Sequence, residues 1–267
     1  MTTKSLKTAH TLLFGENAET YARYRPKYPD FLFKTISKSI DGKKQKAIDV
    51  GAGTGISSVQ LLQYFDEVIA LEPDAKLANF IKKNLNNKGL SVVEGDFNSL
   101  HTNTAEIDII NCSASFHWLN SNEFLAKSKF SLRLGGAICI NTPNIFPIFE
   151  NELQHEITLE FNKVWKLHCH PNLDCLIDSD ILLKKITNIS HFSAPLKKTI
   201  DNIQMLKVKE VMGFFSTLSY FNSYLKTLSE STKLDYLKNL ENVFKKHSEK
   251  DLIKMNFQIH LFHMIKI

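Results

Sequence analysis

Three glycines and two acidic residues stand at spacings that suit a nucleoside ligand. The stretch "AIDVGAGTG" (47–55) passes from an apolar run into a loop of three alternating glycines, and a helical pattern follows. Clustered glycines let the backbone approach a ligand closely. Glu72 and Asp96 end the next two apolar runs along the chain. In a parallel sheet such positions meet at one edge, where ligands bind.

The glycine spacing disfavours a phosphate ligand. In a dinucleotide loop, G-x-G-x-x-G, the third glycine lets the following helix pack closely. Counted from Gly51, that position is Ile56, and Gly55 comes one residue too early. A phosphate loop of the form G-x-x-x-x-G-K-[ST] requires a lysine that this stretch lacks. The loop therefore permits close approach without the arrangement expected for a dinucleotide or for ATP.

The two acidic residues outline an adenosine. Glu72 follows Gly51 by 21 residues, where a carboxylate accepts from both ribose hydroxyls and disfavours a 2′-phosphate. Asp96 in "VVEGDF" can accept from the adenine amino group, with Phe97 beside the ring. The remaining part of the ligand is then small and free of phosphate. S-adenosylmethionine fits this description, with S-adenosylhomocysteine as its product.

The motifs resemble a known family. In this order and spacing, "AIDVGAGTG", "LEPD", "VVEGDF" and "LRLGGAICI" resemble the class I S-adenosylmethionine-dependent methyltransferases over residues 46 to about 141. The leader "YARYRPKYP" and the stretch "SASFHWLN" further resemble the relatives of trans-aconitate methyltransferase. The resemblance implies that Asp49 and the glycines hold the methionine portion and that Ser113 faces the sulfonium.

The leader adds two candidates to the predicted cofactor site. A guanidinium matches carboxylate geometry, so Arg25 is the candidate for the methionine carboxylate, and Tyr21 one turn earlier would cover the cofactor. The predicted cofactor-binding residues are Asp49, Gly51, Gly53, Gly55, Glu72, Asp96, Phe97, Ser113, Arg25, Tyr21 and Trp118.

His117 is the candidate catalytic residue. Methyl transfer from a sulfonium mainly requires alignment and exclusion of water, and a base is needed only if the nucleophile must lose a proton. His117 would act as that base or hydrogen-bond the acceptor, and the alternative is a structural or cofactor-lining role. Trp118 would wall the cofactor or face the sulfonium through a cation–π contact. The alternative is that Trp118 only packs beneath the helical lid expected over residues 146–250.

Apolar runs alternate with helical patterns from residue 46 to 141, which predicts an α/β fold with a Rossmann-like, doubly wound, mostly parallel sheet. The resemblance implies seven strands, the last antiparallel. We expect an N-terminal helical cap (1–40), a cofactor-binding core (41–145), a mainly helical lid (146–250) with a possible strand near 195–206, and a C-terminal strand completing the core sheet (251–267).

Composition and charge limit the kinds of partner, compartment and metal that we expect. The net charge of +5 comes from lysines scattered along the chain, whereas nucleic-acid binders more often concentrate theirs, so we expect no nucleic-acid partner. No apolar span is long enough for a membrane helix, and the N-terminal apolar run is too short for a signal peptide. Four cysteines in 267 residues favour reduced thiols and a cytoplasmic protein. The cluster "HCHPNLDC" matches no usual zinc spacing, so we expect no metal.

These observations predict transfer of a methyl group to a small-molecule acceptor, on an oxygen of a carboxylate or hydroxyl, by in-line displacement. Three alternatives remain. A catalytically silent module would keep the fold as a ligand sensor or protein partner. An RNA or DNA methyltransferase lacks support, because no [DN]-P-P-[YFW] stretch follows the fourth strand. A nicotinamide oxidoreductase would have to tolerate the misplaced third glycine. Protein partners are not predicted.

Overall fold

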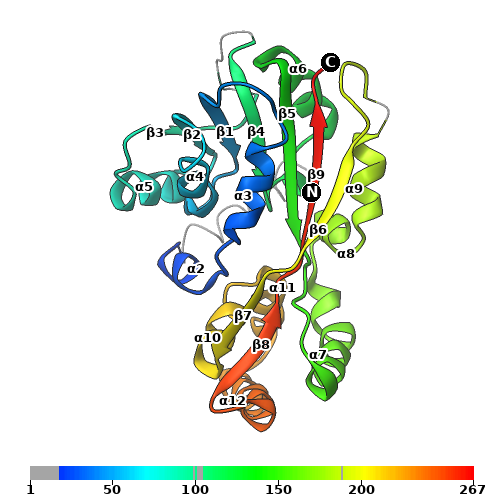
Figure 1. Cartoon of the computed structure of the whole chain (residues 1–267). Helices are drawn as coiled ribbons and strands as arrows, with labels where there is room; N and C mark the ends of the chain where they lie inside the picture. The colour runs from blue at the N-terminus through cyan, green and yellow to red at the C-terminus, as the bar shows by residue number, and fades with distance from the viewer. Residues whose placement is uncertain (1–17, 99, 101–104, 188) are drawn as a thin grey trace.

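The computed structural model describes residues 18–98, 100, 105–187 and 189–267. Its main sheet has the strand order β3-β2-β1-β4-β5-β9-β6, and β9 runs antiparallel to both of its neighbours (Figure 1). The predicted fold class, a mostly parallel Rossmann-like sheet with an antiparallel last strand, is confirmed. The strands are β1 (Lys46–Val50), β2 (Glu67–Glu72), β3 (Leu90–Glu94), β4 (Ile107–Ser113), β5 (Leu132–Pro143), β6 (Leu196–Ile200) and β9 (Ile259–Ile265).

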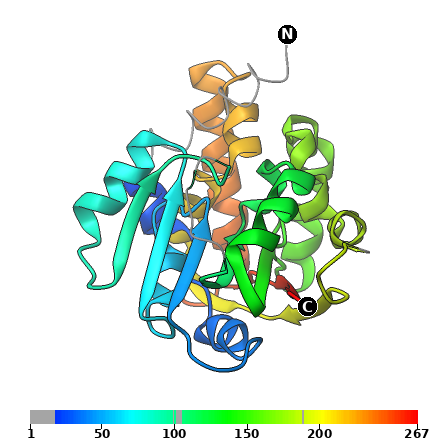
Figure 2. The same cartoon turned by 90° about the horizontal axis from the view of Figure 1, so that it is seen from above.

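Continuous apolar runs build the central strands because both faces of the sheet are covered. Every residue of β4 is buried. One face packs against α3 (Asp30–Ser37), α4 (Ile56–Leu61) and α5 (Ala75–Asn84). The other packs against α6 (Ser121–Ser131) and α9 (Ser179–Ile186). Figure 2 shows α3 and α6 on opposite sides of the sheet.

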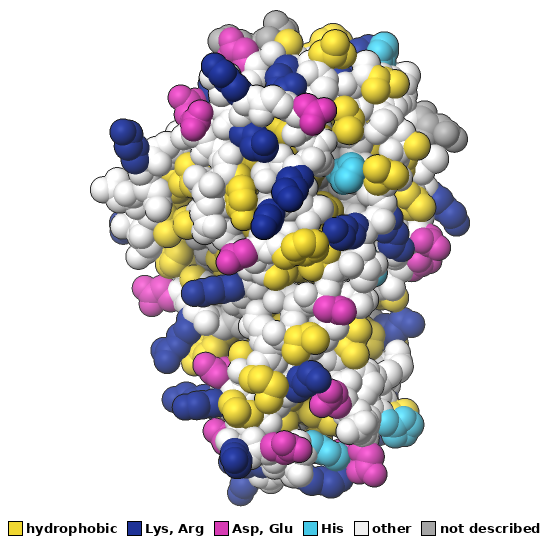
Figure 3. Space-filling view, viewed as in Figure 1, with side chains coloured by type: hydrophobic (Ala, Val, Ile, Leu, Met, Phe, Trp, Pro, Cys, Tyr) yellow, Lys and Arg dark blue, Asp and Glu magenta, His cyan; other side chains and the backbone are white. Residues whose placement is uncertain are grey.

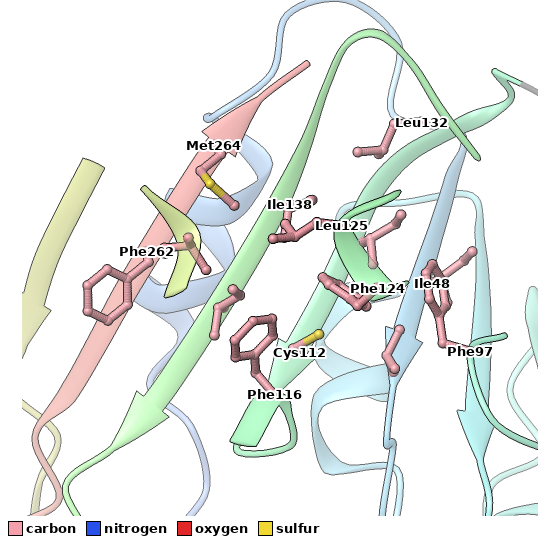
Figure 4. Packing of buried hydrophobic residues seen from close by; sticks show 14 of the residues in the cluster. Ile48, Phe97, Cys112, Phe116, Phe124, Leu125, Leu132, Ile138, Phe262 and Met264 are labelled. Carbon is pink, nitrogen blue, oxygen red and sulfur yellow. The ribbon is translucent and has the colours of Figure 1, made fainter. Parts of the chain in front are cut away.

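An aromatic cluster fills the space between the sheet and α6. Phe97, Phe116 and Phe124 lie together over Ile48 and Cys112 (Figure 4). The ring centroids of Phe97 and Phe124 are 5.0 Å apart, and those of Phe116 and Phe124 are 5.5 Å apart. Phe97, which follows β3, is thereby fixed in the core.

A second body of helices lies below the carboxyl ends of the parallel strands in Figure 1 and has its own aromatic core around the buried Trp165. Its indole N–H donates to Tyr236 Oη at 2.8 Å, and Tyr236 donates to Glu160 at 2.7 Å. The helices are α7 (Asn151–Lys163), α8 (Asp174–Ile177), α10 (Val208–Phe215), α11 (Ser219–Leu225) and α12 (Glu230–His247), with a two-stranded sheet of β7 (Ile203–Lys207) and β8 (Leu252–Asn256).

The chain passes between the two bodies twice near its end. The segment 195–206, expected to hold one strand, forms β6 at the edge of the main sheet and most of β7 in the lid. The segment 251–267 divides in the same way, into β8 beside β7 and β9 between β5 and β6. The domain boundaries at residues 40, 145 and 250 stay predictions.

The described part of the N-terminal cap joins lid and core. Helix α2 (Ala18–Tyr24) packs against α10 and α5. The ring of Tyr24 lies where a side chain on Gly213 would be, since an added Cβ there would be 2.3 Å from Tyr24 Cδ1. No helix within the described ranges has the length and apolarity to cross a membrane.

Candidate active site

A pocket of about 560 Å³ lies at the carboxyl ends of β1, β2 and β4, under the lid and the cap. It brings together ten of the twelve predicted site residues. These are Tyr21, Arg25, Gly51, Gly53, Glu72, Asp96, Phe97, Ser113, His117 and Trp118. Asp49 and Gly55 do not line it.

The glycine loop forms the pocket wall next to β1. Gly51, Gly53 and Gly55 all have positive φ, of 69°, 61° and 82°. A Cβ on Gly51 would meet Ser115 Cβ at 2.6 Å and one on Gly55 would meet Leu85 Cδ1 at 2.4 Å, so both positions are closed by protein. A Cβ on Gly53 would meet no protein atom within 4 Å. Gly53 therefore leaves open space on the ligand side, which fits a loop that approaches a ligand.

Glu72 holds this loop in place. Its carboxylate accepts from the backbone N–H of Gly53 at 2.7 Å and of Asp74 at 2.9 Å. The side chain is 4% exposed, and burial raises the pKa of Glu72 to about 7, against the lowering effect of the two hydrogen bonds. Each carboxylate oxygen keeps a second lone pair, so Glu72 can also accept from ribose hydroxyls.

Asp49 lies below the pocket rather than in its wall. Its oxygens accept from the hydroxyls of Ser57 and Ser58, both at 2.6 Å, and from Asn111 Nδ2 at 2.8 Å. Burial raises the pKa of Asp49, and these three hydrogen bonds lower it. The expectation that Asp49 itself contacts the methionine portion differs from this geometry, because Asp49 does not line the pocket. No local sequence pattern indicates its three partners.

Asp96 and Phe97 lie together at another side of the pocket. Asp96 is exposed, whereas Phe97 is 3% exposed and contributes only part of its ring to the wall. The Lys127 ammonium lies 5.5 Å from the Phe97 ring centroid. Phe97 thus belongs to both the core and the pocket.

Arg25 is fixed at the lid side of the pocket. Its Nη2 donates to the carbonyl of Thr217 at 3.1 Å, and its guanidinium lies 4.7 Å from the Tyr21 ring centroid and 5.6 Å from that of Phe214. Its Nε is buried and has no hydrogen-bond partner in the protein. A buried donor without a partner is costly, so this atom fits a site for an anionic ligand group.

His117 and Trp118 lie in the turn after β4. Their ring centroids are 5.0 Å apart, and His170 from the "HCHPNLDC" stretch lies 5.1 Å from Trp118. Burial, together with the charges of His170 and Lys185, lowers the pKa of His117 to about 3. Its Nδ1 is buried without a hydrogen-bond partner. The imidazole is therefore neutral near pH 7 and is a poor general base. No group of three or more His, Cys, Asp or Glu side chains that could hold a metal ion occurs in the part of the chain that the structure describes.

The structure adds lining residues that the sequence did not single out. Tyr28, between Pro26 and Pro29, lines the pocket beside Arg25. Asn202 from the loop between β6 and β7 and several apolar lid residues line it as well. The two prolines predict an irregular segment, but no sequence signal shows which side chain of that segment reaches the site.

The surface charge agrees with the scattered lysines of the sequence. On the face shown in Figure 3, basic and acidic side chains are interspersed and form no stripe of one sign.

The sheet order, the antiparallel β9 and the glycine loop after β1 define the Rossmann-like fold of class I S-adenosylmethionine-dependent methyltransferases. A sequence model of the methyltransferase domain matches residues 48–140. A protein of Dictyostelium discoideum named as a methyltransferase is 25% identical over 253 residues, which cover 93% of this chain and 92% of the relative.

A methyltransferase of Bacillus cereus is 30% identical over 166 residues, which cover 60% of this chain and 73% of the relative. The solved structure of a methyltransferase from Anaeromyxobacter dehalogenans, described as type II, has a TM-score of 0.71 at 15% identity. The superposition covers 90% of this chain and 97% of the Anaeromyxobacter protein, and this likeness concerns the fold alone. The chain belongs to the methyltransferase family, and it is an S-adenosylmethionine-dependent enzyme.

Proposed function

We propose that this enzyme methylates an oxygen of a small-molecule acceptor, and that the acceptor oxygen belongs to a carboxylate. The observation that carries the proposal is the single pocket of about 560 Å³ in which the glycine loop, Glu72, Asp96, Arg25 and His117 all meet. A pocket of this size suits small ligands and is covered by the lid.

The cofactor fits the pocket residues as follows. Asp96 and Phe97 would receive the adenine, and Glu72 the ribose hydroxyls. Gly51 and Gly53 would lie along the methionine portion, whose carboxylate would bind Arg25, with Tyr21 and Trp118 as walls and Ser113 towards the sulfonium. The unpartnered Nε of Arg25 and the open space beside Gly53 support this arrangement. Gly55 and Asp49 would shape the loop from below. When bound, the cofactor supplies an activated methyl group.

A carboxylate acceptor agrees with a site in which His117 is a poor base and the lining acids Glu72 and Asp96 are assigned to the cofactor. A carboxylate is ionised near neutral pH and attacks without losing a proton, whereas a hydroxyl needs a base. The lowered pKa of His117 favours hydrogen bonding to the acceptor over proton abstraction. The resemblance of "YARYRPKYP" and "SASFHWLN" to the relatives of trans-aconitate methyltransferase supports the same acceptor group.

The unpaired state of Cys112, Cys139 and Cys169 supports a reducing compartment, and we propose the cytoplasm.

Calorimetry with S-adenosylhomocysteine tests the proposed site. Asp96→Ala should weaken binding by ~1–3 kcal/mol, the usual cost of leaving a hydrogen-bonding group unpaired. Glu94→Ala is the matched control, since Glu94 is an exposed acid two residues earlier that does not line the pocket. Equal affinity of the two variants would remove Asp96 from the site.

The alternatives have their own tests. A nucleic-acid methyltransferase should bind an RNA or DNA pool with an affinity that falls steeply as salt rises. No gel shift at low salt would discard it. A catalytically silent module would bind the cofactor but transfer no methyl group to any acceptor.

A further inference from the structure

Tyr28 is held firmly in the pocket wall. Its backbone carbonyl accepts from Gln60 Nε2 of α4 at 2.9 Å, and its ring meets Phe33 of α3 edge-to-face with centroids 5.9 Å apart. The preceding carbonyl, of Lys27, accepts from Asn202 Nδ2 at 2.9 Å. Contacts to the core and to the β6–β7 loop therefore fix this residue, and its phenol has little freedom to turn.

Polar side chains of β4 lie beside the Tyr28 hydroxyl. Asn111 Nδ2 donates one proton to Asp49 Oδ1 at 2.8 Å and the other to Ser113 Oγ at 2.9 Å. Ser113 in turn lies next to the Tyr28 phenol and can donate its own proton to the phenol oxygen. Since Tyr28 lines the pocket, its O–H group is available there as a hydrogen-bond donor.

The charges that line the pocket limit the acceptor. Arg25 is the only lysine or arginine in the described part of the pocket wall, and the proposed function assigns it to the methionine carboxylate. Of the three lining acids, Glu72 and Asp96 are assigned to the cofactor, and Glu123 accepts from Asn98 and Asn120. The pocket thus offers hydrogen-bond donors to the acceptor, but no second cation.

The lid side of the pocket is mostly apolar and, apart from Arg25 of the cap, carries no charged side chain among the described residues. Its apolar lining residues are Ile145, Leu173, Leu176, Phe214, Leu218 and Phe257, and its polar ones are Asn144, Asn202, Ser219 and Tyr220. A polycarboxylate bound against these side chains would lose hydration at each charge without gaining a cationic partner. An apolar body would instead be stabilised by burial.

We propose that the acceptor carries one carboxylate on an apolar body, and that Tyr28 donates a hydrogen bond to that carboxylate and positions it for attack. This inference rests on the proposed function and narrows it. One carboxylate oxygen accepts from Tyr28, and the other forms the new bond to the methyl carbon. The carbon–sulfur bond breaks, its electron pair stays on sulfur, and the product is a methyl ester, with no proton transferred. Tyr28 acts as a donor throughout and keeps its proton, in agreement with the raised pKa that burial gives it.

Calorimetry on the protein saturated with S-adenosylhomocysteine tests this inference with four probes: octanoate, octanol, octylamine and trans-aconitate. Octanoate should bind at least tenfold more tightly than each of the other three. With S-adenosylmethionine in place of the product, mass spectrometry should detect methyl octanoate.

Tyr28→Phe removes the donor and keeps the ring. It should weaken octanoate binding at least tenfold and leave the affinity for S-adenosylhomocysteine within twofold. Tyr64→Phe is the matched control, because Tyr64 packs against the same apolar cluster as Tyr28 without lining the pocket. It should leave both affinities unchanged.

The outcomes separate the two proposals. If S-adenosylhomocysteine fails to bind, the proposed cofactor site is wrong. If it binds but octanoate does not, or if trans-aconitate or octylamine binds as tightly as octanoate, the acceptor inference is wrong. Unchanged octanoate binding in Tyr28→Phe would remove Tyr28 from its positioning role.

Discussion

Replacing Gly53 with alanine separates loss of the cofactor from loss of the fold. Gly53 has a φ of 61°, lines the pocket, and would place an added Cβ at least 4 Å from other protein atoms. A left-handed conformation costs a non-glycine residue about 1–2 kcal/mol. For a chain of this size the melting temperature should therefore fall by roughly 2–8 °C. The protein should still fold.

The new methyl group would stand in the space that we assign to the methionine portion of the cofactor. We expect the affinity for S-adenosylhomocysteine to fall at least tenfold, which corresponds to about 1.4 kcal/mol. Titration calorimetry measures the affinity, and a thermal melt of the same samples measures the strain.

Gly42→Ala is the matched control for this experiment. Gly42 has a φ of 82°, an added Cβ there would also meet no atom within 4 Å, and the residue lies outside the pocket in the turn before β1. Both variants carry a similar backbone strain, but only Gly53→Ala should lose affinity. Equal affinity in the two variants would refute the assignment of this loop to the cofactor.

Substitutions at three further residues test the electrostatics of the site. Folded Glu72 has a pKa of about 7, against an ordinary value of 4.5, so its contribution to the free energy of unfolding is complete below pH 4.5 and is lost as the pH rises through 7. Glu72→Gln should remove this loss of about 3 kcal/mol. If the free energy of unfolding, measured by urea denaturation, changes equally with pH in Glu72→Gln and in the native protein, the raised pKa of Glu72 is wrong. The pH dependence that His117 gives to stability has the opposite sign. Because the pKa of folded His117 is lowered, the free energy of unfolding decreases as the pH falls from 6.5 towards 3, and His117→Asn should flatten this decrease. If His117→Asn leaves the decrease in stability between pH 6.5 and 3 unchanged, the imidazole is not buried as described. Asp49→Ala removes the acceptor of three buried hydrogen bonds and should cost about 3 kcal/mol or more, whereas Asp49→Asn should cost less. Similar denaturation midpoints for Asp49→Ala and the native protein would count against the network.

The core of the fold was predictable because its strands are buried on both faces. Such strands give short continuous apolar runs, as in the buried stretch 137–140 of β5, and the helices between them keep their own period. The pocket wall next to β1 was predictable for a related reason. Positive φ at Gly51, Gly53 and Gly55 can be read from the glycines themselves, and the strand ends place Glu72 and Asp96 nearby.

The rest of the site depends on contacts between distant segments. Tyr28 reaches the pocket because distant residues hold its segment, with Gln60 donating to the Tyr28 carbonyl and Asn202 to the Lys27 carbonyl. Asp49 was predicted to contact the cofactor, but it lies outside the pocket lining and accepts from Ser57, Ser58 and Asn111. These pairings follow from strand register and loop geometry, which one sequence does not encode in a local pattern.

The end of the chain illustrates the same limit. The alternation in "MNFQIHLFHMIKI" predicts extended structure, and the segment is extended. Its division between β8 in the lid and β9 inside the main sheet depends on Asn256, whose carbonyl accepts from Ile148 N–H at 2.9 Å and whose side chain accepts from Asn202 N–H at 3.0 Å. Neither partner is close in sequence.

A thermal melt with S-adenosylmethionine, S-adenosylhomocysteine, NADH, NADPH and ATP tests which ligand the pocket beside the glycine loop binds. A ligand at 100 times its dissociation constant stabilises the fold by ~2.7 kcal/mol, which corresponds to a rise in melting temperature of roughly 5–11 °C for this chain length. We expect this rise with the two S-adenosyl compounds and none with the others. No rise with those two, or a larger rise with a dinucleotide, would contradict this expectation.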